Sequence, residues 1–128
     1  MIDLYTWTTP NGRKVSILLE ELCIPYTVHS IDISKNEQFA SDFLKIAPNN
    51  RIPAIIDQET GVHLMETGAI MMYLASKHRK FQCRGDEYWR MVEWMMWQVG
   101  GLGPMLGQLH YFVKYNKGTS AYAEKRYQ

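Results

Sequence analysis

The sequence predicts an α/β domain, in which one mixed sheet is covered by helices, followed by a helical region. In the first part, stretches that alternate apolar and polar residues are separated by stretches with apolar residues three and four apart. From Asp86 onward, only the helical spacing continues, with many tryptophan and methionine residues. A chain of 128 residues is long enough for one ordinary domain, or for a small domain and a piece of another.

The first half of the α/β domain is predicted to be strand, helix, strand. Residues 2–6 and 26–31 alternate as strands do, and residues 12–23 between them have the spacing of a helix. We expect Asn11 to cap this helix, because a short polar side chain before a helix can accept hydrogen bonds from its free N–H groups. Pro25 is expected to stop it.

The second half is predicted to be helix, hairpin, helix. Residues 38–46 predict a short helix, and residues 52–56 and 62–65 flank a Gln-Glu-Thr-Gly turn that is typical of a β-hairpin. A third helix is expected to begin at Thr67. The order β-α-β-α-β-β-α, with a right-handed β-α-β unit before an antiparallel hairpin, predicts a thioredoxin-like domain over residues 1–78.

The remaining chain predicts a linker at 79–85 and a partial helical domain at 86–128. Gly100–Pro104 is expected to interrupt the helix that begins at Asp86. That helix is apolar on two faces, so one face needs a partner beyond the first domain. We expect a homodimer in which the face of Trp94 and Trp97, or the region 100–107, meets the second subunit.

Composition argues against several other classes of protein. Fourteen basic residues against 13 acidic ones give a net charge of +1, so neither a nucleic-acid footprint nor a basic membrane patch is expected. The apolar stretches are far shorter than the roughly 20 residues of a membrane span. The N-terminus does not read as a secretory signal, and the two cysteines lie far apart, so we expect a cytoplasmic protein with reduced thiols. The four histidines lack metal-ligand spacing, so no metal site is expected.

A candidate ligand site surrounds Ile52 and Pro53. Proline cannot donate to a sheet ladder, so Pro53 should lie at the start of a strand or in an edge strand. A cis bond before it would leave the backbone N–H and C=O of Ile52 free to pair with an extended peptide. Glu66 and Thr67 stand where a strand leads into a helix, whose N-terminus attracts carboxylates. From these two features we expect a peptide-like ligand with a carboxylate and an ammonium group. Gln38 could hydrogen-bond its far end; the alternative is that Gln38 is an ordinary solvated polar residue.

Thioredoxin-like domains often carry Cys-x-x-Cys at the start of the first helix, but residues 7–11 are Trp-Thr-Thr-Pro-Asn. The chain cannot be its own dithiol catalyst at that position, but it could activate a thiol brought by a ligand. Thr9 and Asn11 could donate hydrogen bonds to it, and donors beside a positive helix end favour the thiolate. The alternative is that both side chains only cap the helix.

These motifs resemble those of the cytosolic glutathione transferase superfamily. Pro-Asn-Asn-Arg-Ile-Pro-Ala at 48–54 and Glu-Thr-Gly-Ala at 66–69 are typical of the superfamily. Trp-Gln-Val-Gly-Gly-Leu-Gly-Pro at 97–104 is a narrower motif, similar to that of the bacterial nu-class glutathione-dependent disulfide-bond oxidoreductases.

The resemblance implies that glutathione, as the thiol or the disulfide, is the co-substrate and that a small-molecule or peptide disulfide is the partner. It implies glutathione-binding roles for Gln38, Arg51, Ile52, Pro53, Glu66, Thr67 and Arg126, and catalytic roles at the sulfur for Thr9 and Asn11. Conjugation of glutathione to an electrophile, or a non-catalytic regulatory module that binds glutathione, are the alternatives. Family members carry a complete helical second domain, so this chain is expected to hold an incomplete one.

Overall fold

The computed structural model describes all 128 residues, which form two units, Met1–Gln82 and Cys83–Gln128. The first unit contains four strands and three α-helices, in the order expected from the sequence, with two short 3₁₀ turns between β2 and α2. The elements are β1 (Ile2–Thr6), α1 (Pro10–Glu21), β2 (Tyr26–Ser30), α2 (Ser41–Leu44), β3 (Ala54–Asp57), β4 (Val62–Met65) and α3 (Thr67–His78).

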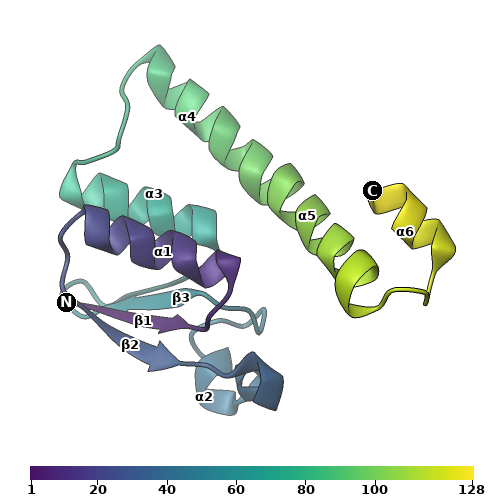
Figure 1. Cartoon of the computed structure of the whole chain (residues 1–128). Helices are drawn as coiled ribbons and strands as arrows, with labels where there is room; N and C mark the ends of the chain where they lie inside the picture. The colour runs from purple at the N-terminus through teal and green to yellow at the C-terminus, as the bar shows by residue number, and fades with distance from the viewer. The chain divides into compact units, whose positions relative to one another are not determined.

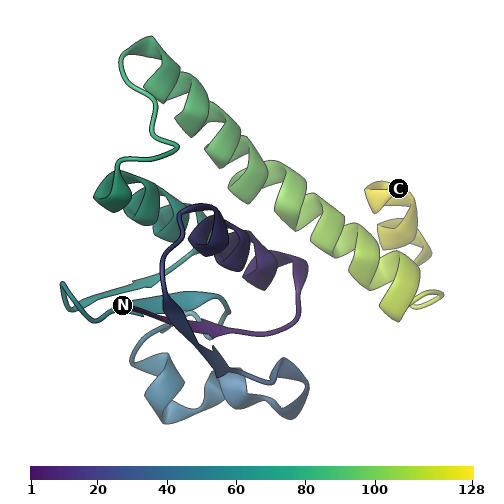
Figure 2. The same ribbon diagram turned by 60° about the vertical axis from the view of Figure 1, so that its left-hand side comes forward.

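The four strands form one mixed sheet in the order β2-β1-β3-β4. β1 runs parallel to β2 and antiparallel to β3, and β3 pairs antiparallel with β4. α1 and α3 lie side by side on one face of the sheet, and α2 lies on the other (Figure 1); Figure 2 shows the same layers from a second direction. This arrangement confirms the predicted thioredoxin-like fold.

Two clusters of apolar side chains hold these layers together. The larger cluster fills the space between the sheet and the helix pair α1 and α3, and all its core members are at most 8% exposed. It consists of Ile2, Leu4, Val15, Leu18, Leu19, Leu22, Ile55, Ile70 and Leu74. The smaller cluster, Phe43, Ala47 and Ala54, packs α2 against the other face. Alternating side chains of β1 and β3 therefore supply both cores, as the sheet pleat requires.

The start of α1 differs from the sequence prediction. Thr9 is the N-cap, with its Oγ1 accepting from the N–H of Gly12 at 3.1 Å, and Pro10 is the first helical residue. The prediction that Asn11 caps the helix is wrong, because proline favours the first helical position and moves the cap to the residue before it. Gly12 is buried against β1: a Cβ there would lie 2.6 Å from the carbonyl oxygen of Trp7. The helix can approach the strand this closely only with glycine at that position.

The predicted helix at 38–46 is also only partly formed. The chain makes a 3₁₀ turn at Glu37–Phe39 and then the short α2, separated by Ala40 in an extended conformation (φ −61°, ψ 137°). Phe43 is 3% exposed, whereas Phe39 is 54% exposed. The two phenylalanines therefore do not share one buried helix face, although their spacing of four allows it.

Most of the second unit is one long helical stretch. α4 (Asp86–Trp97), a π-helical turn (Gln98–Leu102), α5 (Gly103–His110) and a second π-helical turn (Tyr111–Tyr115) form one continuous helix (Figure 1). The predicted interruption near Gly100–Pro104 is present only as a change of helix type, from α to π and back, and the chain stays helical through it. Pro104 lacks an N–H donor, and the helix accommodates the change by a wider turn in which Gly103 N–H donates to Gln98 O.

α6 (Ala121–Tyr127) folds back on the end of this helix, where the rings of Phe112 and Tyr127 stack with centroids 5.8 Å apart. None of the residues in the second unit is fully buried. Trp94 is 63% exposed and Trp97 is 51% exposed. The role of this tryptophan face at a subunit contact stays a prediction. No helix of the chain combines the length and the apolar character needed to cross a bilayer.

Candidate functional site

The register of the sheet brings three loops to one end of the first unit. Tyr5, near the end of β1, pairs with Ala54 at the start of β3, and Ala54 pairs with Met65 at the end of β4. The loop after β1, the loop before β3 and the turn after β4 therefore meet at the same end of the sheet. These are the loops that carry Thr9, Ile52–Pro53 and Glu66.

The segment before β3 presents unpaired backbone. The Ile52–Pro53 peptide bond is cis, the isomer considered from the sequence. The β3 ladder begins at Ala54, so the N–H and C=O of Ile52 stand outside it. Pro53 is buried, Ile52 is partly exposed and the Arg51 side chain is exposed without an ion-pair partner. An extended ligand could pair with Ile52 as a short strand does.

The turn after β4 exposes the N-terminus of α3. Glu66 occupies the N-cap position with φ 72° and ψ 116°, and its exposed side chain makes no capping hydrogen bond. A non-glycine residue at positive φ is uncommon and costs free energy, and such residues concentrate at functional sites. Thr67 follows as the first residue of the twelve-residue helix. The first-turn N–H groups have no side-chain cap, so they are available to a carboxylate.

Thr9 and Asn11 keep hydrogen-bond donors free at the start of α1. Thr9 uses its oxygen as an acceptor from Gly12 N–H, which leaves the hydroxyl proton available. Asn11 Oδ1 accepts from Lys14 Nζ at 3.0 Å, which leaves the side-chain NH₂ group available. Capping by Thr9 and donation to a ligand sulfur are therefore compatible, and Asn11 does not cap.

Gln38 lies in Glu37–Phe39, the second of the two 3₁₀ turns between β2 and α2. Its Oε1 is buried and has no hydrogen-bond partner. A buried acceptor without a donor is destabilising, and a ligand that reaches it would relieve this cost. Rotation of the amide would present the NH₂ group to a carboxylate instead.

Arg126 belongs to the second unit, on α6, and its exposed side chain forms no ion pair. Its part in the site stays a prediction. His, Cys, Asp and Glu side chains form no group of three that could hold a metal ion.

The sequence did not single out a polar cluster at the opposite end of the sheet. Asp57, the last residue of β3, is fully buried; it accepts from Tyr73 Oη and Lys77 Nζ, both at 2.6 Å. Burial by itself would raise the pKa of Asp57, but the hydrogen bonds from Lys77, Tyr73 and Glu59 N–H hold that pKa well below its usual range. The same bonds to Asp57 and Glu59 raise the pKa of Lys77. An acidic residue that ends an apolar strand, with tyrosine and lysine four apart on the next helix, is the signal that could have revealed it.

The family model of the glutathione S-transferase N-terminal domain matches residues 1–76. The disulfide-bond oxidoreductase YfcG of Escherichia coli is 46% identical over an alignment that covers 100% of this chain and 62% of that protein. The chain spans about half to six tenths of the length of the first curated relatives it matches.

Solved structures agree with this match. A glutathione transferase family member from Pseudomonas fluorescens, solved with two glutathione bound, has a TM-score of 0.93 and 39% identity, covering 98% of this chain and 59% of that one. A glutathione transferase from Pseudomonas putida, solved with one glutathione disulfide per subunit, has a TM-score of 0.89 and 35% identity, covering 98% and 58%. With more than half of its residues inside the family model, and with the sheet, the proline turn and the α3 start in their predicted places, the chain belongs to the glutathione S-transferase family.

Proposed function

We propose that the protein is a glutathione-dependent disulfide-bond oxidoreductase. The observation that carries the proposal is the 46% identity with a disulfide-bond oxidoreductase along the whole chain. The start of α1 agrees with it, since Thr9-Pro10-Asn11 offers donors but no sulfur. The redox-active sulfur atoms would then belong to glutathione and to the substrate.

In this proposal glutathione binds in an extended conformation across the end of the sheet. Its cysteinyl backbone pairs with the N–H and C=O of Ile52, beside Arg51 and Pro53. Its γ-glutamyl carboxylate meets the N-terminus of α3 at Thr67, and its ammonium meets the Glu66 carboxylate. The glycyl end reaches Gln38, with Arg126 as a further contact in the assembled protein.

The thiol of the bound glutathione lies beside Thr9 and Asn11. Donors near the start of α1 stabilise the negative charge of the thiolate and so lower the pKa of the thiol. The thiolate attacks one sulfur of a small-molecule or peptide disulfide, forming a mixed disulfide and releasing the other sulfur as a thiolate, which takes up a proton. A second glutathione thiolate attacks the glutathione sulfur of the mixed disulfide. It releases the remaining substrate thiol and forms glutathione disulfide.

The assembled protein is proposed to be a homodimer that acts in the cytoplasm, where glutathione is kept largely reduced. The exposed face of Trp94 and Trp97 supports association, because exposed aromatic clusters of this kind usually contact a partner. Light scattering tests this step: a monomer at micromolar concentration would contradict the dimer.

Calorimetric titration with reduced and oxidised glutathione tests the ligand site. We expect saturable binding, weakened about ten- to a hundredfold by Glu66→Ala, since a charge-assisted hydrogen bond contributes roughly 1.5–3 kcal/mol. Glu21→Ala, which removes an exposed carboxylate at the end of α1 away from Thr9, is the matched control and should bind as the unsubstituted chain does. Failure of the folded chain to bind either form would overturn the proposal.

A coupled assay of glutathione disulfide exchange tests the chemistry. Asn11→Ala, alone and with Thr9→Ala, should lower turnover at saturating glutathione, because the thiolate loses its donors. Unchanged turnover would remove both residues from the mechanism. Conjugation of an electrophile without disulfide reduction would assign a transferase activity instead, and binding without either turnover would favour a regulatory module.

A further inference from the structure

The two segments proposed to hold glutathione lie at the starts of two different elements, β3 and α3. At their opposite ends, β3 and α3 are linked to each other by hydrogen bonds. Ile52–Pro53 precedes β3, whose last residue is Asp57; Glu66 precedes α3, which carries Lys77 one residue before its end. Asp57 pairs with Ile2 in the sheet, at the end opposite the candidate site. The distal ends of both elements therefore meet at one place.

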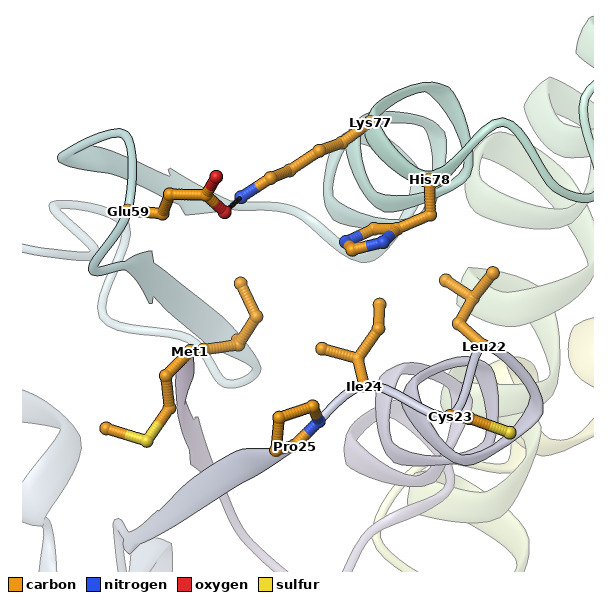
Figure 3. A pocket seen from close by; sticks show the side chains of 9 residues that line it. Met1, Leu22, Cys23, Ile24, Pro25, Glu59, Lys77 and His78 are labelled. Carbon is orange, nitrogen blue, oxygen red and sulfur yellow. Dashed lines mark hydrogen bonds and ion pairs between the residues drawn. The ribbon is translucent and has the colours of Figure 1, made fainter.

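The contacts between these two distal ends are polar, and their side chains are hydrogen-bonded to one another. The Asp57 carboxylate accepts from Tyr73 Oη at 2.6 Å, from Lys77 Nζ at 2.6 Å and from the N–H of Glu59 at 3.0 Å. Lys77 Nζ also donates to Glu59 Oε2 at 2.7 Å, and Tyr73 Oη lies 2.8 Å from Thr60 Oγ1. Figure 3 shows Lys77 extended from α3 to Glu59 along the rim of a cavity of about 270 Å³. We name Asp57, Glu59, Thr60, Tyr73 and Lys77 the distal clasp.

The apolar contacts of α3 hold the helix on the sheet. Ile70 and Leu74 are fully buried there, but the hydrophobic effect that favours their burial is non-directional. Hydrogen bonds weaken steeply with misalignment, so the clasp defines one position along the helix axis. An unbroken helix from Thr67 to Lys77 rises about 15 Å at 1.5 Å per residue and transmits such a shift from one end to the other.

We propose that the distal clasp is a positioning device: it sets the distance between the N-terminus of α3 and the Ile52 backbone, and thereby the fit of glutathione between them. This inference rests on the proposed function, because it assigns the clasp a role in the same site. A buried ionic group need not add net stability, and in some proteins it specifies one structure, which agrees with a positioning role. Tyr73 and Lys77 are positioning residues here, since neither lies at the ligand end of α3.

Tyr73→Phe in the full chain is the test, because it removes one hydroxyl and leaves the ring, Lys77 and Asp57 in place. Leu74→Met is the matched control: Leu74 is the next residue of α3 and takes no part in the distal clasp, and we expect both variants to lose only a little stability. We expect Tyr73→Phe to weaken glutathione binding roughly three- to tenfold at a temperature where both variants are fully folded, and Leu74→Met to stay within about twofold.

Amide resonances of the ligand-free variants supply a readout that does not depend on glutathione. Tyr73→Phe should shift the resonances of Ile52, Thr67 and Gly68, which are far from the substitution, whereas Leu74→Met should leave them in place. Equal effects of both variants, or shifts confined to residues 57–60 and 70–78, would overturn the inference. If the unsubstituted chain binds no glutathione, the proposed function fails, and the amide shifts alone decide whether the clasp positions α3.

Discussion

Asp57 is a carboxylate with no exposed surface, and its neighbours decide its charge state. Hydrogen bonds from Lys77, Tyr73 and the Glu59 N–H hold its pKa far below the ordinary value of an aspartate, despite burial. The folded chain therefore keeps Asp57 ionised at any pH at which the unfolded chain does, and further into acid. Removing the Lys77 ammonium while the carboxylate stays buried should cost about 3–5 kcal/mol.

The loss of stability at acidic pH should depend on the ionisation of Asp57. A carboxylate with a lowered folded pKa adds stability that is complete above its unfolded pKa, near 4, and is lost as the pH falls towards the folded value. We expect the free energy of unfolding, from urea titrations between pH 3 and pH 7, to fall more steeply for the unsubstituted chain than for Asp57→Asn. Glu59→Gln is the control, because Glu59 is the exposed partner of Lys77. This variant should keep most of the pH dependence of the free energy of unfolding. Parallel profiles for all three would contradict the assignment.

At the scale of elements, local sequence explains most of what formed. The alternating stretches became β1, β2 and the hairpin, and Thr67 begins α3 as predicted. Where local signals competed, the outcome depended on contacts that spacing does not reveal. Thr9 rather than Asn11 caps α1 because Pro10 takes the first helical position, and Pro104 is absorbed by a π-helical turn because flanking helical residues sustain the helix on both sides.

Substitutions of Thr9 and Asn11 should differ in their effect on stability, because only Thr9 caps α1. Thr9→Ala removes the acceptor for Gly12 N–H and should lower the free energy of unfolding by about 0.5–2 kcal/mol, whereas Thr9→Ser should retain most of it. Asn11→Ala should change stability little, because the Asn11 side chain is exposed and its hydrogen bond is to Lys14, also on the surface. Thermal unfolding of the three variants checks this. A larger loss for Asn11→Ala than for Thr9→Ala would show that the cap is assigned to the wrong residue.

At the scale of the whole chain, the two units differ in how much surface they bury. The first unit encloses two apolar clusters, whereas the second has no fully buried residue. The change of pattern at Asp86 predicted where the helical region begins, and the family resemblance added that a complete second domain contains more helices. Spacing shows which helix faces are apolar, but it does not show what lies against them. The distal clasp escaped prediction for the same reason, since it joins residues 16 and 20 positions apart.

Hydrogen exchange should resolve the two units. Protection of a backbone amide follows the local density of buried contacts. Amides of β1 and β3, which lie between both clusters, should exchange slowest, and those of α4 to α6 should exchange at least about tenfold faster in the isolated chain. Raising the protein concentration should slow exchange in α4 if the tryptophan face is a dimer contact. Uniform protection along the chain would contradict this order.

The start of α1 carries hydroxyl and amide groups where related folds carry cysteine. An enzyme whose reactive sulfur is its own cysteine can lose activity permanently, because alkylation or oxidation beyond the sulfenic acid converts that atom irreversibly. In the proposed mechanism the reactive sulfur belongs to glutathione. It would enter the site with each glutathione molecule and leave with the product. Oxidised or alkylated glutathione would then leave the site, and the protein would stay active under conditions that inactivate a dithiol enzyme.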